Sequence, residues 1–490
     1  MTTETVLGVD IGTSATKGVL VGLDGTIVAR ARREHGLDLP RPGWAEHDAE
    51  RIWWDEFVSV CRELAPQAGG GLRAVGVSGI GPCVVPCDAN LRPLRPAILY
   101  GIDTRAGAEI AELERTLGAD AVLSRGGSAL SAQALGPKLL WLARNEPDVW
   151  KRCAGWYMPS SFIAGRLTGS YVLDHHSASQ CDPLYDLDQA RWAYDWVQDT
   201  VDDLPMPELV WPVEQVGSVA AAAAEVTSLP AGTPVVAGTI DAWAEAFSAG
   251  VRAPGDLMLM YGSTMFFVQV VEASTRHPLL WTTQGIERDS LSLAAGMSTS
   301  GSLTEWVRHL AGDPAWDDLL GEAAASPPGA RGLLMLPYFA GERTPIHDPL
   351  ARGLVAGLTL RHGRGDMLRA VYEATAFGAR QILELFAAAG GAPRRAVAVG
   401  GGTSADLWLQ TVSDVTGVTQ QVPAETIGAS HGVALLAAIG AGLVPPETDW
   451  SRHSHEVTPV SGNRPLYDHL FGLYGELYPA TAEIVHQLSG

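Results

Sequence analysis

The sequence predicts an α/β protein in which two domains of similar topology face each other across a central cleft. The prediction rests on a repeat, because a strand, a glycine turn and a returning strand occupy residues 6–21 and again residues 256–271. Each unit is followed later by a buried strand that ends in glycine, at residues 72–80 and 395–402. Strands that alternate with helical segments in this way are typical of a mixed α/β fold.

The chain has 490 residues, enough for two domains with large cores, and we place these domains at residues 1–248 and 249–490. The formal net charge of −21 disfavours nucleic acid and anionic membranes as partners, because both bind basic surfaces. The longest apolar run, residues 432–444, is shorter than the ~20 residues that span a bilayer.

The chain starts with Met1 to Glu4, which carries no signal-peptide pattern, and its five cysteines are odd in number and unevenly spread, as in a reducing compartment. We therefore expect a cytoplasmic protein whose partners include neither nucleic acid nor membrane, and we leave a homodimer open.

The N-terminal half is predicted to open with three strands, at residues 6–9, 16–21 and 26–33, the last two joined by a tight turn at Asp24-Gly25. Apolar residues with helical spacing then predict a helix over residues 50–64. In the C-terminal half, the segment 452–463 is polar and contains proline, so we expect a surface connection there. The last predicted helices cover residues 367–388, 406–416, 432–441 and about 465–487.

The first turn carries groups that suit a phosphate and its metal. Asp10 ends the first strand, Gly12-Thr13 turn the chain and Lys17 lies on the returning strand. Backbone N–H groups, a hydroxyl and a lysine can bind an anion, and the carboxylate can bind a cation. The alternative is an ordinary hairpin, in which Lys17 only marks the exit of a strand.

The second turn, Gly262-Ser263-Thr264, repeats the glycine and hydroxyl pattern of the first. Asp241 lies where the predicted strand before it runs into a helix. An aspartate at that junction is a common helix cap, but between two phosphate turns it could also act as the base of a phosphotransferase.

In this order the motifs resemble those of the FGGY carbohydrate kinases, and among them the xylulokinases, which belong to the actin-like ATPase (ribonuclease H-like) superfamily. The resemblance covers essentially the whole chain. Residues 10–14 are similar to the first phosphate loop of the family, and residues 138–141 to its first signature, although Gln133 and Leu135 depart from the upstream positions. Residues 341–345 resemble a xylulokinase stretch, and residues 353–373 fit the second family signature at every position.

The resemblance implies a role for each matched residue. Asp241 falls at the catalytic aspartate, and Asp10 with Asp241 would hold Mg²⁺ through waters. The sugar would lie against Gly81, Pro82, Asp103, Asp241 and Ala242. The expected ATP-binding residues are Thr13, Ser14, Lys17, Gly262, Ser263, Thr264, Gly301, Glu305, Gly400, Gly401, Gly402 and Asp406.

The departures from the family pattern lie at the sugar. Gly81-Pro82 replace a Met-His pair, and Ala242 replaces an asparagine that follows the catalytic aspartate. Polar contacts to hydroxyls discriminate strongly between substrates, so the substrate need not be D-xylulose. For Arg105 we weigh a role beside Asp103 against an ordinary salt bridge.

The expected reaction transfers the γ-phosphoryl group of ATP to a primary hydroxyl of a ketose, with D-xylulose or a related pentulose as the first expectation. Ribulose, a polyol such as a tetritol, and a deoxy-sugar remain alternatives, as do a non-catalytic sugar or nucleotide sensor and a protein-binding ATPase. ATP on the second domain and sugar on the first would meet when the cleft closes. We interpret Trp44, Trp243 and Trp306 as core residues rather than as stacking platforms.

Overall fold

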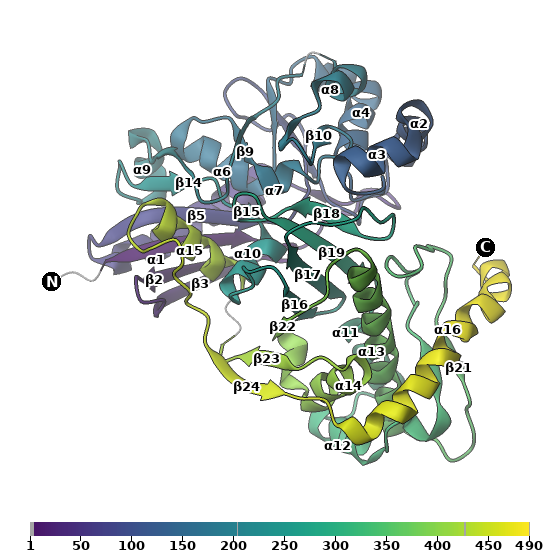
Figure 1. Ribbon diagram of the computed structural model, residues 1–490. Helices are drawn as coiled ribbons and strands as arrows, with labels where there is room; N and C mark the ends of the chain where they lie inside the picture. The colour runs from purple at the N-terminus through teal and green to yellow at the C-terminus, as the bar shows by residue number, and fades with distance from the viewer. Residues whose placement is uncertain (1–3, 203, 426–427, 490) are drawn as a thin grey trace.

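Two seven-stranded sheets form the centre of the computed structural model of the protein, which describes residues 4–202, 204–425 and 428–489 (Figure 1). The first sheet has the order β13-β14-β5-β1-β2-β3, and β15 also pairs with β5. In it, β1 runs antiparallel to β2 and parallel to β5. Its strands are β1 (Thr5–Ile11), β2 (Ala15–Gly22), β3 (Ile27–Glu34), β5 (Leu72–Gly79), β13 (Gln215–Ser218), β14 (Pro234–Val236) and β15 (Thr239–Ile240).

The second sheet has the order β18-β19-β17-β16-β22-β23-β24. Here β16 runs antiparallel to β17 and parallel to β22, so the pairing β3-β2-β1-β5-β14 of the first sheet is repeated by β19-β17-β16-β22-β23. This repeat confirms two domains of similar topology. The strands are β16 (Asp256–Tyr261), β17 (Met265–Val271), β18 (Trp281–Gln284), β19 (Leu291–Met297), β22 (Arg395–Val399), β23 (Gln420–Pro423) and β24 (His453–Val457).

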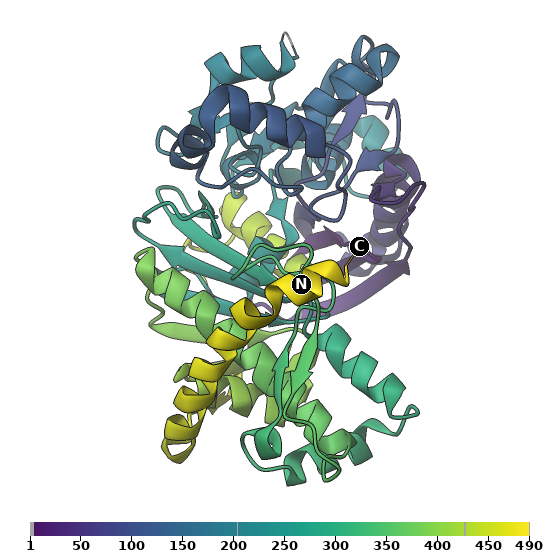
Figure 2. The ribbon, with the colours of Figure 1, turned by 90° about the vertical axis from the view of Figure 1, so that its right-hand side faces the viewer.

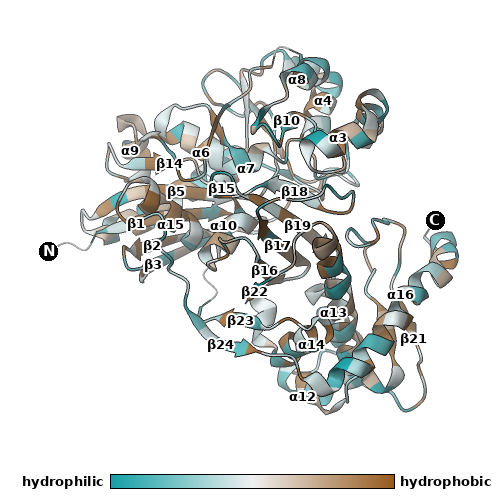
Figure 3. Ribbon diagram, viewed as in Figure 1, coloured by the Kyte–Doolittle hydropathy of each residue, from teal (hydrophilic) through white to brown (hydrophobic). Residues whose placement is uncertain are grey.

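The central strands are buried because nearly every residue on them is apolar or small; all seven residues of β1 are buried. Figure 3 shows a related contrast, with apolar colouring on strands such as β5 and β17 and mixed colouring on the outer helix α16 (Arg464–Gln487).

The short strands outside the two sheets pair as β4 (Glu46–His47) with β7 (Ala97–Ile98), β6 (Val85–Cys87) with β8 (Gly155–Tyr157), β9 (Val172–Asp174) with β12 (Glu208–Val210), β10 (Tyr185–Asp186) with β11 (Arg191–Trp192), and β20 (Leu334–Leu336) with β21 (Leu354–Ala356).

Helices cover the sheets and fill out each domain, and Figure 2 shows the two halves one above the other. None of the helices in the described part of the chain combines the length and the apolar character that crossing a membrane requires. The main helices are α1 (Glu56–Leu64), α2 (Gly107–Leu113), α3 (Ala119–Gly126), α4 (Gly136–Asn145), α6 (Pro159–Thr168), α8 (Tyr194–Val201), α9 (Ala221–Thr227), α10 (Asp241–Ser248), α11 (Gly301–Leu310), α12 (Trp316–Ala325), α13 (Arg364–Ala388), α14 (Asp406–Thr416), α15 (Ala429–Gly440) and α16.

Two helices lie between the sheets. α10 follows β15 of the first sheet and leads into β16 of the second, while α15 comes from the C-terminal half and packs against α10, β1 and β5 (Figure 1). α15 is almost wholly apolar, as expected of a helix that is buried on all sides. The two halves of the chain are thus joined by a shared helical layer.

Three expectations from the sequence need correction. The segment 452–463 is not only a connection, because its residues 453–457 form the exposed edge strand β24 beside β23. Trp306 is not in the core: it lies exposed on α11 and meets the ring of Phe339 edge-on at 4.7 Å. The helix expected over residues 50–64 begins as a wider π-helical turn, Ala49–Asp55, before it continues as α1. Residues 1–3, where no signal peptide was expected, lie outside the described residues.

Candidate active site

Two carboxylates, those of Asp10 and Asp241, lie close enough to affect each other's ionisation, and each is placed by the end of a strand. Asp10 is the last but one residue of β1, is 6% exposed, and accepts a hydrogen bond from the Ser78 hydroxyl at 2.9 Å. Asp241 is the first residue of α10, and its Oδ1 accepts the Ala242 N–H at 2.8 Å. Burial and then the charge of Asp10 raise the pKa of Asp241 to about 7. Burial also raises the pKa of Asp10.

A third carboxylate, Glu245, lies one helical turn beyond Asp241 and was missed from the sequence. Burial and then the Asp10 charge raise its pKa to about 7, and the Lys17 ammonium acts in the opposite direction. Lys17 lowers the pKa of Asp10 and of Asp241 as well, although in both it is a weaker influence than burial. The spacing i, i+4 after Asp241 was the signal available in the sequence, because it places both carboxylates on one helical face.

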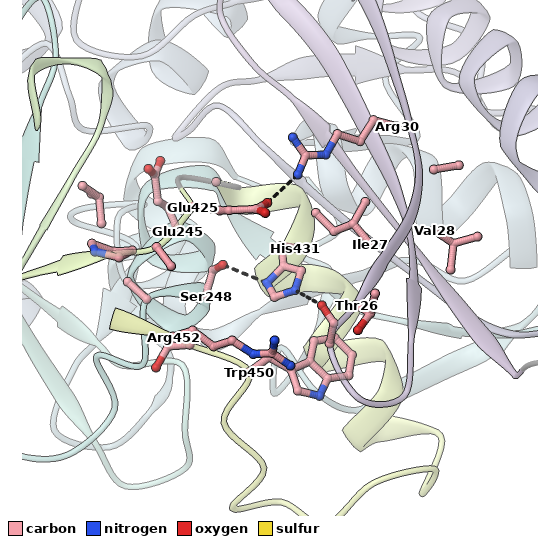
Figure 4. A pocket seen from close by; sticks show the side chains of 18 residues that line it. Thr26, Ile27, Val28, Arg30, Glu245, Ser248, Glu425, His431, Trp450 and Arg452 are labelled. Carbon is pink, nitrogen blue, oxygen red and sulfur yellow. Dashed lines mark hydrogen bonds and ion pairs between the residues drawn. The ribbon is translucent and has the colours of Figure 1, made fainter. Parts of the chain in front are cut away.

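Glu245 also lines a cavity of about 540 Å³ between β3, α10 and α15, which Figure 4 shows from close by. In that cavity the buried ring of His431 accepts a hydrogen bond from the Ser248 hydroxyl at 3.2 Å and donates Nε2–H to the Gly25 carbonyl at 3.2 Å. The imidazole thereby ties α15 to α10 and to the turn between β2 and β3. Burial lowers the pKa of His431, in agreement with a neutral ring.

The first glycine turn is held by hydrogen bonds between Gly12 and both the Ala15 carbonyl and the ring of His35. The Gly12 N–H donates to the Ala15 carbonyl at 3.0 Å, and the Gly12 carbonyl accepts Nε2–H from His35 at 3.0 Å. The other ring nitrogen of His35 contacts a Glu56 oxygen at 2.9 Å. This support leaves Thr13 and Ser14 at the top of the turn, with Thr13 Oγ1 bonded to the Tyr100 hydroxyl at 3.0 Å.

The second glycine turn is held by the start of α11. The Gly262 carbonyl accepts the Gly301 N–H at 3.0 Å, and the Ser263 carbonyl accepts the N–H groups of Ser300 and Ser302 at 3.0 and 3.1 Å. A Cβ on Gly301 would lie 2.4 Å from the Gly262 carbonyl oxygen, so the contact requires glycine at that position. Gly301 therefore supports the turn through its backbone, whatever it contributes to the nucleotide.

The remaining predicted ATP residues lie beyond this second turn. Gly400 follows β22 with φ +93°, and a Cβ there would lie 2.6 Å from the Tyr261 carbonyl, so glycine is needed for packing. Gly401 is exposed with open space beside it, Asp406 begins α14, and Glu305 lies exposed on α11. Because Gly400 packs beside Tyr261, whose β16 leads into Gly262, the glycine triplet lies near the second turn.

The residues predicted to bind the sugar have different surroundings, and Asp103 is enclosed in the first domain. Asp103 is fully buried; it accepts the Ala45 N–H at 2.7 Å and pairs with Arg105 at 2.7 Å. Arg105 also pairs with Glu46 at 2.8 Å and stacks over Trp44 at 3.8 Å. The two residues therefore form an internal ion pair, and Asp103 does not line the cavity of about 510 Å³ between the domains.

That cavity, of about 510 Å³, opens between the domains beside the two turns and is lined by Tyr100, Gln133 and Thr264. Gln133 reaches toward the predicted sugar segment, because its amide donates to the Gly81 carbonyl at 3.3 Å and accepts the Gly101 N–H at 3.1 Å. Pro82 is buried next to Gly81. Trp243 is buried against Phe266, as expected for a core residue.

The oxygen donors suit Mg²⁺. Asp10 and Asp241 are the residues that would hold it, and among the described residues no three His, Cys, Asp or Glu side chains are grouped to bind a metal directly. Mg²⁺ keeps several of its waters and uses one or two carboxylates in such sites, so this donor set fits the ion.

Two matching hairpin turns, one from each domain, with carboxylates and a lysine beside the first, are typical of a two-domain phosphotransferase that acts with ATP. Comparison with known proteins agrees. Residues 5–248 match the model of the N-terminal domain of the FGGY family of carbohydrate kinases, and residues 257–441 match that of its C-terminal domain. The chain belongs to the FGGY family of carbohydrate kinases.

The relatives of this chain are named for more than one substrate. The xylulose kinase of Bacillus subtilis is 28% identical, over 98% of this chain and 97% of its own. The glycerol kinase of Nocardia farcinica is 29% identical, over 91% and 93%. The crystal structure of xylulose kinase from Rhodospirillum rubrum superimposes with a TM-score of 0.91 and 33% identity, covering 99% of this chain and 100% of that chain.

Proposed function

We propose that the protein transfers the γ-phosphoryl group of ATP to a primary hydroxyl of a ketose, D-xylulose or a related pentulose. Support comes from the similarity to xylulose kinases along the full chain and from the position of Asp241 beside Asp10 and near Tyr100. The observation that carries the proposal is the placement of Asp241 at the start of α10, close to Asp10 at the end of β1, the strand that leads into the first phosphate turn. Burial and then the charge of Asp10 raise the pKa of Asp241 to about 7.

In this proposal Asp241 is the general base. A primary hydroxyl needs a positioned acceptor for its proton as the bond to phosphorus forms, and a base titrating near the working pH serves best. The pKa of Asp241, about 7, meets that requirement. Thr13, Ser263 and Thr264 would bind the phosphates through hydroxyls and backbone N–H groups, with Lys17 as a point charge among them. Mg²⁺ at Asp10 and Asp241 would neutralise the charge of the phosphates.

The nucleotide would lie on the second domain, along Gly301, Glu305, the glycine triplet and Asp406. The sugar would lie in the cavity lined by Tyr100, against the first domain. Closure of the cleft would then bring the two reactants together and exclude water from the γ-phosphate. We expect the sugar to favour the closed state, which would reduce the radius of gyration in small-angle scattering.

A different acceptor is a second candidate, and it is favoured by one observation. Gly81-Pro82 and Ala242 provide no polar side chain where xylulokinases carry Met-His and Asn. The relatives include a glycerol kinase as well as xylulose kinases, so shorter polyols belong in the same screen as the pentuloses.

The test couples ADP formation to a readout and screens D-xylulose, D-ribulose, hexuloses, tetritols, deoxy-sugars and glycerol with Mg-ATP. We expect acceptor-dependent turnover in the wild type and a loss of about 10²–10⁴-fold in kcat for Asp241→Asn, with nucleotide binding retained. Turnover that survives in Asp241→Asn would contradict the role of Asp241, and tight sugar binding without turnover in the wild type would favour a sensor.

A further inference from the structure

The cavity of about 510 Å³ has walls from both domains. The first domain contributes Tyr100 and Gln133, and the second contributes Thr264, Glu342 and Arg343. In the proposed function the acceptor hydroxyl would lie at the first-domain end of this space, beside Tyr100, whose pKa is raised by burial and further by the Asp241 charge.

Arg343 is a half-buried guanidinium without an acidic partner. Its Nη2 donates to the Met297 carbonyl at 3.0 Å, and no carboxylate oxygen of the described residues lies within 4.0 Å of its nitrogens, the distance that defines the ion pairs of this chain. A guanidinium carries five N–H donors in a rigid fork, and burying one without a partner is costly. The side chain therefore keeps donors that a ligand in the cavity can use.

Its neighbour Glu342 acts on the Arg343 guanidinium through its charge: burial lowers the pKa of Arg343, and the Glu342 charge acts in the opposite direction. Glu342 is 3% exposed, and its Oε1 accepts the backbone N–H groups of Ser298 and Arg343 at 2.6 and 2.8 Å. These bonds fix the backbone at residues 342–343, while Oε2 has no hydrogen-bond partner among the described residues. A buried carboxylate oxygen without a donor and a guanidinium with spare donors thus border the same cavity.

Tyr100 faces this pair from the other domain. Arg343 is near enough to act on the pKa of Tyr100, lowering it against the larger effect of burial, and the Tyr100 hydroxyl bonds Thr13 at 3.0 Å. An acceptor in the cavity would touch the first phosphate turn through Tyr100 and the second domain through Arg343.

Building on the proposed function, we infer that Arg343 is a specificity-determining residue of the second domain: its guanidinium binds oxygens of a polyhydroxylated acceptor, opposite the Tyr100 hydroxyl. Glu342 is a positioning residue that fixes the backbone of Arg343. The first domain lacks polar side chains at Gly81-Pro82 and Ala242, so recognition of the sugar would depend on contacts made across the cleft.

The experiment measures D-xylulose binding by calorimetry in the absence of nucleotide, ADP binding separately, and the full kinetics, for Arg343→Gln, Arg343→Lys and Tyr100→Phe. Arg352→Gln is the matched control, because Arg352 lies on the same segment and donates to the carbonyls of Pro349 and Ala351. Thermal melting checks that each variant folds. If another acceptor gives a higher kcat/KM in the screen, that compound replaces D-xylulose.

For Arg343→Gln we expect the Kd and KM of the sugar to rise at least about tenfold while the Kd of ADP stays within twofold of the wild type. Arg343→Lys should recover part of the loss, Tyr100→Phe should weaken sugar binding less, and Arg352→Gln should change nothing. Sugar affinity unchanged in Arg343→Gln would overturn the assignment, as would a loss confined to ADP affinity or kcat, which would instead assign Arg343 to the phosphates.

The two proposals fail in different ways. A wild type that phosphorylates none of the acceptors would remove the proposed function and this inference together. A wild type that phosphorylates D-xylulose, with Arg343→Gln binding the sugar equally well, would remove only the role of Arg343.

Discussion

The two glycine turns look alike in sequence but are held in different ways. The turn at Gly12 rests on a side chain from a distant strand end, His35, which is itself fixed by Glu56. The turn at Gly262 rests on the start of α11, where Ser300 and Ser302 donate both their backbone N–H groups and their hydroxyls to its carbonyls. The first turn is also linked to the acceptor cavity through Tyr100. In the proposed function, the first turn would respond to the sugar side and the second would hold the nucleotide.

The largest effect is expected from a methyl group at the second turn. In Gly301→Ala the new Cβ would lie 2.4 Å from the Gly262 carbonyl oxygen, so the turn must shift. Overpacking of this kind costs about 1–3 kcal/mol. We expect the KM for ATP to rise about tenfold or more, with sugar affinity unchanged. Gly321→Ala is the control, because open space surrounds that position on α12.

If Gly301→Ala lost as much sugar affinity as ATP affinity, the second turn would serve both substrates. This result would contradict the expectation that the two turns serve different substrates.

A smaller effect is expected at the first turn from His35→Gln. The fully buried ring bonds both the Gly12 carbonyl and Glu56, and an unsatisfied buried group costs about 1–3 kcal/mol. We expect the free energy of unfolding to fall by about that amount in urea titration, and kcat/KM to fall for sugar and for ATP together. His309→Gln, exposed on α11, should have no effect on either quantity. Retained activity with normal stability would show that the first turn needs no support from His35.

The smallest effect is expected from a change of charge near the first turn. The two turns also differ in charge, because the charged side chains lie beside the first: Asp10, Asp241, Glu245 and Lys17. The pKa of Glu245 is raised to about 7 in the folded protein, so the folded state holds a proton that the unfolded chain releases above its ordinary value near 4.5. Folding stability therefore falls as pH rises from about 4.5 to 7. Glu245→Gln removes this dependence. We expect the free energy of unfolding to rise at pH 8, by no more than the roughly 3 kcal/mol that this shift corresponds to, and to stay unchanged at pH 4.

The same variant should sharpen the assignment of the base. Without the Glu245 charge nearby, Asp241 should lose its proton at lower pH, so the acid limb of kcat should move to lower pH. An acid limb that stays in place while stability changes as expected would separate Glu245 from the reaction.

The sequence predicted the fold in detail because its signals are local. Hydrophobic runs and glycine turns located the strands of both hairpins, and the helix predicted at residues 406–416 has the bounds of α14. The edge strand β24 was missed because its residues are polar and exposed, and an edge pairs on one side only. Trp306 was expected in the core because hydrophobicity alone does not tell which side of α11 meets solvent.

The candidate site was predicted less completely, because it depends on contacts between distant segments. Asp241 and the two turns could be named from motifs. The bond between Thr13 and Tyr100, separated by 87 positions, and the support of Gly12 by His35 have no local signal. The contacts of Asp103 likewise have no local signal: the motif indicated a place at the sugar, and the structure shows its carboxylate paired with Arg105 and accepting the Ala45 N–H.

The position of α15 has a consequence for how the chain is made. Strands β1 and β5 are synthesised early, yet the helix that covers them, residues 429–440, leaves the ribosome only near the end of translation. The first half therefore cannot bury this apolar face of its sheet until the helix has been made. A fragment that ends at residue 248 lacks α15, so we expect it to expose this apolar face. Co-expression of the second half of the chain should cover the face again.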